Sequence, residues 1–592
     1  MFVDARGIPS GTLIESEICV VGAGAAGITL AREFAGAGVK LCLIESGGLA
    51  FDWKTQSLGA GESVGRAYPD PASCQVRCFG GTTNAWGGWF RALDDIDFQK
   101  RAWVQDSGWP FPPSELLPYY DKAHELCQVA SADYYLRDAV AELDDRRAQI
   151  IPFDSAKLET VLHRFSPPTR FGRVYRDTIE RADNVTCLLH ANALRLETTH
   201  NAATVTRLAV GCLSGGRFEI SAKIFVLAAG SIENARLLLL SNDVAATGLG
   251  NQHDLVGRYF MDHPHRTRVL IPGPRRPELA LYGLSFKKRG ISSRIALSPG
   301  VQEKEGLLNY GANIHPVYDG ETSWQALKNL ARALAPSRRF DPYLRGSLPF
   351  ERKRVSVGQI VDVVRHMDKV AAASFCRLFS PARCVSSFVL ESKPEQAPNR
   401  YSRITLGSER DAFGLNRVRV DWQLTALDRR TLVRAEEIID DELQRLGVGR
   451  LTPLSESERE DEAGNFVGGW HQMGTTRAHI DPKQGVVDAQ GKVHGMSNLF
   501  VAGASVFPTG GAASPTPTIL ALTLRLASHL RLLSLDRIAS AQEGRRPAEA
   551  INLGTWATRE PQGRAGRLSR QRARSRVPMQ EPAPPLSHAP PP

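Results

Sequence analysis

The sequence predicts an α/β protein that combines a parallel sheet with an antiparallel one. Short, wholly apolar runs at residues 18–21, 41–44, 224–227 and 499–501 are typical of parallel strands buried on both faces. Each of these runs is followed within three residues by a glycine. Residues 289–297 and the segments "SRITLGS" and "NRVRVDWQL" instead alternate apolar and polar side chains, which favours antiparallel strands.

The segment "EICVVGAGAAGITLAREFAGAGVKLCLIESGG" predicts one strand–helix–strand unit that binds a dinucleotide. Gly22, Gly24 and Gly27 have the spacing G-x-G-x-x-G, which lets the backbone turn tightly and approach a pyrophosphate at a helix N-terminus. Glu45 ends the second strand, where its carboxylate can accept hydrogen bonds from a ribose 2′-hydroxyl. The same carboxylate repels a 2′-phosphate, so NADP is disfavoured, while NAD and FAD both remain open.

Four further segments indicate a family. "CFGGTTNAWGGWF", "IFVLAAGSIENARLLLLSN", "VGRYFMDHPH" and the stretch from "HQMGTTRAHIDP" to "LRLASHL" resemble, in this order, segments of the glucose–methanol–choline (GMC) oxidoreductases. The resemblance covers residues 17–530. It implies an enzyme that uses FAD to oxidise alcohols, with a Rossmann-like FAD-binding domain and an α+β substrate-binding domain built on an antiparallel sheet.

The resemblance also implies which residues contact FAD. Together with the strand–helix–strand unit, it gives these candidates: Gly22, Gly24, Ala26, Gly27, Glu45, Ser46, Gly80, Gly81, Thr82, Thr83, Asn84, Ala85, Ala193, Ala229, Gly230, Gly503, Ala504, Ser514, Pro515 and Thr516. Some relatives carry a histidine that binds the flavin covalently at or beside Ala85. An alanine has no nucleophile, so we expect non-covalent FAD.

His471 is the candidate catalytic base. A lone histidine is more often a structural residue, but the resemblance on both sides of His471 implies that it takes the hydroxyl proton while the carbon-bound hydrogen leaves as hydride to flavin N5. Ser514 stands where the family commonly has Asn or His. Its hydroxyl can orient a substrate oxygen but cannot act as a second base, and the alternative interpretation is a simple helix cap.

The helix predicted at "ILALTLRLASHL" begins after Ser514, Pro515 and Thr516, which are residue types that start helices. Its N-terminus would stabilise negative charge on the pyrimidine edge of the flavin, as the resemblance implies. The order of the motifs predicts an FAD-binding domain from residues 1–265 and 466–540 and a substrate-binding domain from residues 266–465. Residues 331–366 are interpreted as a lid over the site or, preferably, a solvated insertion.

Residues 541–592 are expected to form a disordered basic tail. They hold nine Arg, four Glu and nine of the 36 prolines, and so supply half of the net charge of +10. The tail contains a single aromatic residue, Trp556, and therefore lacks the stacking platform that nucleic-acid binding needs. We expect no nucleic-acid partner.

The remaining composition predicts a cytoplasmic protein without a metal site. The nine cysteines are scattered, and Cys74 and Cys78 have no second pair at metal-ligand spacing, so free thiols are expected. No apolar run approaches the roughly 18 residues of a membrane span, and the first residues do not form a basic segment followed by an apolar one. We therefore expect neither a membrane anchor nor a signal peptide.

The predicted function is oxidation of a CH–OH group in a sugar-like, polyol or secondary-metabolite alcohol, with oxygen, a quinone or a carrier protein as external acceptor. Trp86, Trp89 and Trp470 can offer flat surfaces to a sugar ring or belong to the core. The unusual Ser514 motivates an alternative, a non-redox or decarboxylating flavoprotein of the lyase type. A binding module that uses the basic tail is less favoured, because the flavin motifs would then have no role.

Overall fold

The computed structural model describes residues 1–130, 134–274, 278–318, 385–459, 466–468 and 470–543, with five single positions between 365 and 375. The chain divides into one unit spanning Met1–Asp536 and another spanning Arg537–Pro592. The predicted insertion at 331–366, apart from Arg365, and the predicted tail beyond residue 543 lie outside the described residues.

The first sheet contains the strands of the dinucleotide-binding unit. Its order is β1 (Phe2–Asp4), β7 (Val185–Leu189), β3 (Leu41–Glu45), β2 (Leu13–Val21), β10 (Arg217–Leu227), β9 (Val205–Gly211) and β8 (Asn192–Thr198), with β19 (Leu499–Val501) on the far half of β10. The pairs from β1 to β10 and the pair β10–β19 are parallel, whereas β9 is antiparallel to both of its neighbours. All four predicted parallel strands are present.

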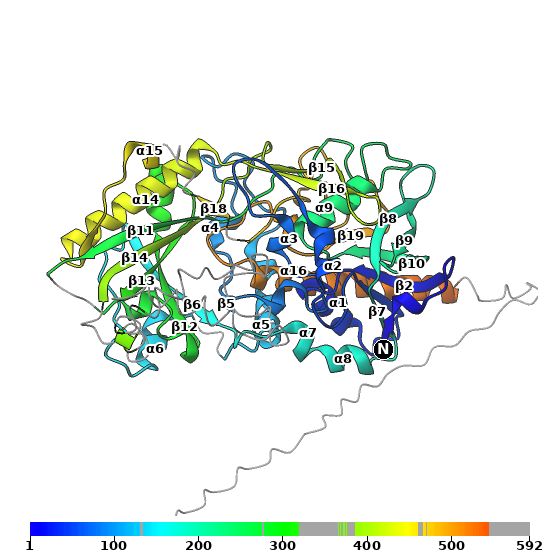
Figure 1. The fold of residues 1–592 in the computed structure, drawn as a ribbon, viewed down its shortest axis with the longest axis horizontal. Helices are drawn as coiled ribbons and strands as arrows, with labels where there is room; N and C mark the ends of the chain where they lie inside the picture. The colour runs from blue at the N-terminus through cyan, green and yellow to red at the C-terminus, as the bar shows by residue number, and fades with distance from the viewer. Residues whose placement is uncertain are drawn as a thin grey trace, which may run out of the picture. The chain divides into compact units, whose positions relative to one another are not determined.

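The runs 18–21, 41–44, 224–227 and 499–501 of this sheet are apolar because both faces of the sheet are covered there. In β2, Cys19 and Val21 point into one hydrophobic core, and Ile18 and Val20 point into another on the opposite face. The second of these cores includes side chains of α1 (Ala25–Phe34) and α16 (Thr516–Glu543), and the first includes α9 (Ser231–Leu240) (Figure 1). Period-two alternation places successive residues of the apolar run 18–21 in the two cores by turns.

The second large sheet is antiparallel at every pairing. Its order is β17 (Gly449–Leu451), β11 (Pro264–Pro272), β14 (Val385–Pro394), β13 (Tyr310–Tyr318), β12 (Ile291–Leu297), β6 (Leu158–Phe165) and β5 (Trp89–Phe90), with β18 (Val467–Gly468) on β11. Helix α14 (Ala426–Arg445) packs against this sheet (Figure 1). A capping box between Thr425 and Asp428 starts the helix, and its buried face includes Leu432, Ile439 and Leu443.

The fold class expected from the sequence, a Rossmann-like α/β sheet joined to an antiparallel sheet, is confirmed. Some strands belong to another sheet than the expected domain bounds imply. Strands β5 and β6, from before residue 266, belong to the second sheet. The "SRITLGS" and "NRVRVDWQL" strands, β15 (Arg403–Arg410) and β16 (Asn416–Trp422), form a third sheet with β4 (Gly61–Gly65), to which β16 is parallel. The division into two domains stays a prediction.

The shorter helices connect these layers. They are α2 (Trp53–Gln56), α3 (Pro71–Cys74), α4 (Asp95–Phe98), α5 (Leu117–Leu126), α6 (Leu136–Ala141), α7 (Phe171–Val174), α8 (Arg176–Arg181), α10 (Pro299–Glu305) and α15 (Glu456–Arg459). Within the described ranges, no helix combines the length and apolar character needed to cross a membrane. The seven described cysteines are free and buried, and no cluster of possible metal ligands occurs in the same part of the chain.

Candidate active site

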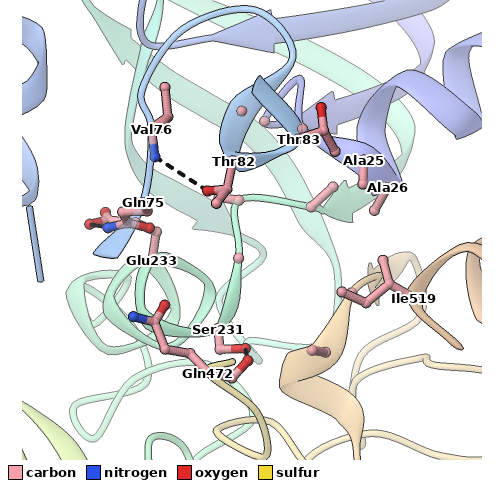
Figure 2. A pocket seen from close by; sticks show the side chains of 18 of the residues that line it. Ala25, Ala26, Gln75, Val76, Thr82, Thr83, Ser231, Glu233, Gln472 and Ile519 are labelled. Carbon is pink, nitrogen blue, oxygen red and sulfur yellow. Dashed lines mark hydrogen bonds between the residues drawn. The ribbon is translucent and has the colours of Figure 1, made fainter. Parts of the chain in front are cut away.

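A cavity of about 700 Å³ opens at the carboxyl ends of β2, β3, β10 and β19. Ligands bind at this edge of an open parallel sheet. Most of the predicted FAD-contacting residues line it: Gly22, Gly24, Ala26, Glu45, Ser46, Gly81, Thr82, Thr83, Ala85, Ala193, Ala229, Gly230, Gly503, Ala504, Ser514, Pro515 and Thr516. Figure 2 shows Ala25, Ala26 and Ile519 on this wall, with Thr82 accepting a hydrogen bond from the Val76 amide (3.3 Å).

Three predicted contact residues, Gly27, Gly80 and Asn84, are not part of the lining. They shape the turns behind it. A Cβ atom on Gly27 would lie 1.8 Å from the Gly22 carbonyl oxygen, so only glycine lets α1 start this close to β2. Asn84 is buried and donates to the Phe79 carbonyl (2.8 Å), and the Gly80 amide donates to the Ala23 carbonyl (2.8 Å).

The Glu45 carboxylate is held rigidly at the end of β3. Its Oε2 accepts from the Ala23 amide (3.0 Å), and its Oε1 accepts from the Gly47 amide (2.9 Å) and the Ser46 hydroxyl (3.2 Å). Each carboxylate oxygen has more than one lone pair, so Glu45 retains the capacity to accept hydrogen bonds from a ribose. Glu45 is the last residue of β3 and lines the cavity.

The cavity has the shape that a dinucleotide needs beside its glycines. Gly24 caps the N-terminus of α1, and a Cβ atom there would meet no protein atom within 4 Å. The same holds for Gly503, at the end of β19. Both glycines line the cavity, so the open space beside them is part of it. With Glu45 on the same wall, these residues fit FAD.

His471 lies in the same cavity, on a segment held by a buried carboxylate. Asp262 Oδ1 accepts from the His471 amide (2.8 Å), and Asp262 Oδ2 accepts from the Trp470 amide (3.0 Å) and the Tyr68 hydroxyl (2.6 Å). The His471 side chain is partly exposed to the cavity. Its Nδ1 lies 2.8 Å from Nδ1 of His263, a residue that sequence reasoning did not single out.

The charge environment keeps the His471 imidazole neutral. Burial, reinforced by His263, His265, Lys393 and Arg294, holds the pKa of His471 well below its usual value of 6.5. A neutral imidazole at neutral pH has one nitrogen that can accept a proton. Ser514, 6% exposed, lines the cavity at the approach to α16.

The antiparallel sheet contributes a polar wall that the sequence did not reveal. Lys393 and Glu391 lie on β14 and His265 on β11, and all three line the cavity. Glu391 accepts from Lys393 Nζ (2.9 Å) and contacts His315 Nε2 (3.2 Å). Positions 391 and 393 lie on the same face of β14, because side chains two residues apart in a strand point the same way. This spacing in the sequence could have indicated that Glu391 and Lys393 lie together.

Aromatic rings complete this end of the cavity. Trp86, Trp89 and Trp470 all line it, whereas the other tryptophans in the described residues do not. Trp470 is 48% exposed, so a broad flat surface remains available. The guanidinium of Arg294 lies 4.6 Å from the centre of the Trp89 ring. Beyond this wall, Gln75 donates to Glu233 (3.3 Å), and both side chains line the cavity near Ser231 and Gln472 (Figure 2).

Comparison with known proteins identifies the family. The sequence model of the family described as GMC oxidoreductase matches residues 398–523. Paromamine 6'-oxidase of Streptomyces fradiae is 23% identical over 557 residues, which cover 86% of this chain and 90% of that protein. 2-Methyl-1,2-propanediol dehydrogenase of Mycolicibacterium austroafricanum is 27% identical over 348 residues, which cover 58% of this chain and 53% of that protein, so the match spans about half of this relative. Residues 398–523 match the GMC oxidoreductase family directly, and the similarity of the rest of the chain to these relatives supports the same family.

The fold agrees with this membership. The crystal structure of pyridoxine 4-oxidase from Mesorbium loti superposes with a TM-score of 0.54 at 19% identity, over 87% of this chain and 99% of that one. The GMC oxidoreductase match and the relatives named as oxidases and dehydrogenases make this chain an oxidoreductase enzyme and support FAD as its cofactor. The family matched by the sequence motifs is therefore confirmed.

Proposed function

We propose that this GMC oxidoreductase oxidises a CH–OH group of a sugar-like or polyol substrate, with bound FAD as hydride acceptor and His471 as base. The observation that carries the proposal is the position of His471. A neutral imidazole, whose Nδ1 is the ring nitrogen bonded to a side chain among the described residues, lines the same cavity as the dinucleotide-binding residues. Its Nε2 is the nitrogen left to receive a proton from a substrate hydroxyl.

The residues at the carboxyl ends of β2, β3 and β19 would hold FAD. Gly24 and Gly503 leave room for backbone approach, Glu45 accepts from a ribose, and the N-terminus of α1 favours the pyrophosphate. FAD supplies the acceptor for the hydride when it is bound. The N-terminus of α16, which begins at Thr516 on the cavity wall, favours negative charge nearby.

The cavity wall supports a polyhydroxylated substrate. Lys393, Glu391 and His265 offer both hydrogen-bond donors and acceptors, and Trp89 and Trp470 offer flat apolar surface. Sugar rings present the same combination of apolar faces and hydroxyl edges. Relatives named paromamine 6'-oxidase and fructose dehydrogenase large subunit act on such molecules by name, whereas 2-methyl-1,2-propanediol is a smaller diol.

We propose that the FAD is non-covalent and that the electrons leave to an external acceptor: oxygen, a quinone or a carrier protein. Ala85 lines the cavity without a nucleophile. Cys74 also lines it, but burial raises the pKa of its thiol to about 12, so little thiolate is present at neutral pH. Acid precipitation should release all yellow colour into the supernatant, and colour in the pellet would point to a covalent link at Cys74 or a histidine.

The function is tested by anaerobic mixing of the FAD-loaded protein with D-fructose, paromamine, glycerol and 2-methyl-1,2-propanediol. At least one of these alcohols should bleach the yellow absorbance. The variant His471→Ala should keep its FAD and slow the bleaching by ~10²–10⁴-fold, the usual contribution of a positioned general base. Product formed without bleaching would instead support the non-redox alternative, and bleaching at the wild-type rate by His471→Ala would contradict the assigned base.

A further inference from the structure

His263 and His471 form an imidazole pair in which His263 is buried and His471 reaches the cavity. Their Nδ1 atoms lie 2.8 Å apart, and their rings stand nearly perpendicular, at 89° with centroids 5.0 Å apart. His263 is 2% exposed, and its Nε2 lies 2.8 Å from the carbonyl oxygen of Gly511. Each nitrogen of His263 therefore has one specific partner, and one of the two is His471.

These partners determine where the ring protons lie. A carbonyl oxygen only accepts, so Nε2 of His263 carries its proton. Burial lowers the pKa of His263 to about 4, so at neutral pH its ring has no second proton and Nδ1 accepts. The hydrogen bond between the rings then requires the proton of His471 on Nδ1. Nε2 of His471 is left with its lone pair.

We propose that His263 is a positioning residue that holds His471 as the tautomer protonated on Nδ1, and so makes Nε2 the base. This inference rests on the proposed role of His471. The identity of a histidine partner commonly sets which ring nitrogen is protonated, and a wrong tautomer leaves a catalytic histidine in place but unable to accept the proton.

The backbone prevents the pair from separating. Asp262 Oδ1 accepts from the amides of both His263 (2.7 Å) and His471 (2.8 Å), although the two histidines are 208 residues apart in sequence. Asp262 is fully buried. One carboxylate therefore anchors both segments, and the ring of His471 has a fixed reference for its orientation.

The test is a mutational cycle read by anaerobic flavin bleaching with the fastest alcohol of the panel. His263→Leu removes both hydrogen bonds and should slow bleaching by ~10²-fold or more, since loss of tautomer control costs up to about 10⁴-fold in a comparable histidine. His263→Asn keeps an oxygen that can accept from His471 Nδ1 and should recover at least about half of the lost factor on a logarithmic scale. Substrate affinity, from the concentration dependence, should change less than about 3-fold in both variants.

The double variant separates positioning from a general structural role. If His263 acts through His471, adding His263→Leu to His471→Ala should slow bleaching less than about 3-fold further, because residues that act as a unit are not additive. An equal loss in both backgrounds, or a wild-type rate for His263→Leu beside a slow His471→Ala, overturns the inference and leaves the proposed function standing. A wild-type rate for His471→Ala overturns the proposed function itself.

A second readout does not depend on turnover. Nitrogen NMR of protein labelled with ¹⁵N-histidine, with the His471 signals assigned by difference from His471→Ala, reports the protonated ring nitrogen directly. The expected result is a proton on Nδ1 in the wild type and a mixture of tautomers in His263→Leu. A proton on Nε2 of His471 in the wild type overturns the inference, whatever the bleaching rates.

Discussion

The surroundings of His471, the proposed base, keep its imidazole unprotonated. Burial is the main cause of its lowered pKa, and the groups that face it, His263, His265, Lys393 and Arg294, act in the same direction. Protonation removes the lone pair, so the rate of flavin bleaching should fall as the pH drops through this pKa and stay at its maximum above it. Because the pKa is lowered, the midpoint of the acidic limb should lie below 6.5.

Stopped-flow bleaching between pH 4 and 8 measures this limb. The same profile for His471→Ala should be flat over the range in which the wild type changes. A wild-type midpoint above 6.5 would contradict the charge environment described for the cavity.

Glu391 is expected to determine specificity, because its carboxylate binds Lys393 and His315 beside the cavity. Glu391→Gln should raise the half-saturating concentration of a sugar-like substrate by about 10-fold or more, as expected for a lost charged hydrogen bond of ~1.5–3 kcal/mol. The maximal bleaching rate and FAD content should change little.

A matched control is Glu17→Gln, which removes a carboxylate from an ion pair with Lys223 on the surface (3.1 Å). That substitution should leave all three quantities unchanged. Equal half-saturating concentrations for Glu391→Gln and the wild type would exclude the polar wall from substrate binding.

At the scale of elements, the turn between β2 and α1 is expected to position the dinucleotide. Gly24→Ala adds a methyl group where no protein atom lies within 4 Å, and the backbone there has φ of −84°, which alanine tolerates. The methyl group should instead collide with FAD and weaken its binding by about 5–150-fold, the equivalent of ~1–3 kcal/mol. Titration of the FAD-free protein with FAD measures the change.

Gly7→Ala is the control for this element. A Cβ atom there also meets nothing within 4 Å, but Gly7 is not part of the cavity lining. Its FAD affinity should match the wild type. If Gly24→Ala binds FAD equally well, the open space beside α1 is not the pyrophosphate site.

At the scale of the whole molecule, α16 links the site to the core of the first sheet. Leu524, Leu526 and Leu530 of this helix are at most 4% exposed. A chain that ends at Thr523 should fail to fold, because three lost core leucines at ~2–5 kcal/mol each approach or exceed a typical total stability of ~5–15 kcal/mol. A chain that ends at Ser540 should keep its FAD and melt within about 2 °C of the full chain.

Thermal unfolding followed by circular dichroism, with FAD content from absorbance, compares the two truncations. Loss of FAD from the chain ending at Ser540 would show that residues after 540 contribute to the fold or the site, against the expectation from their composition.

The amino-acid sequence by itself determined the dinucleotide-binding unit and most of the cavity wall. Apolar runs predicted β3 and β19 to within a residue, and glycine spacing placed Gly22 and Gly24 at the cavity. These features are readable because a strand buried on both faces and a tight glycine turn each have a local pattern. His471 was found because the sequence on both sides of it resembles a known family, since a single histidine has no local pattern of its own.

Only the tertiary structure decided which distant segments meet. It paired β16 with β4 rather than with the large antiparallel sheet, brought Glu391 and Lys393 to the cavity, and set His263 beside His471. Local periodicity records which face of a segment is buried but not which segment covers it. Sheet register and the packing of elements hundreds of residues apart determine those contacts, and they decide the polar wall and the partner of His471.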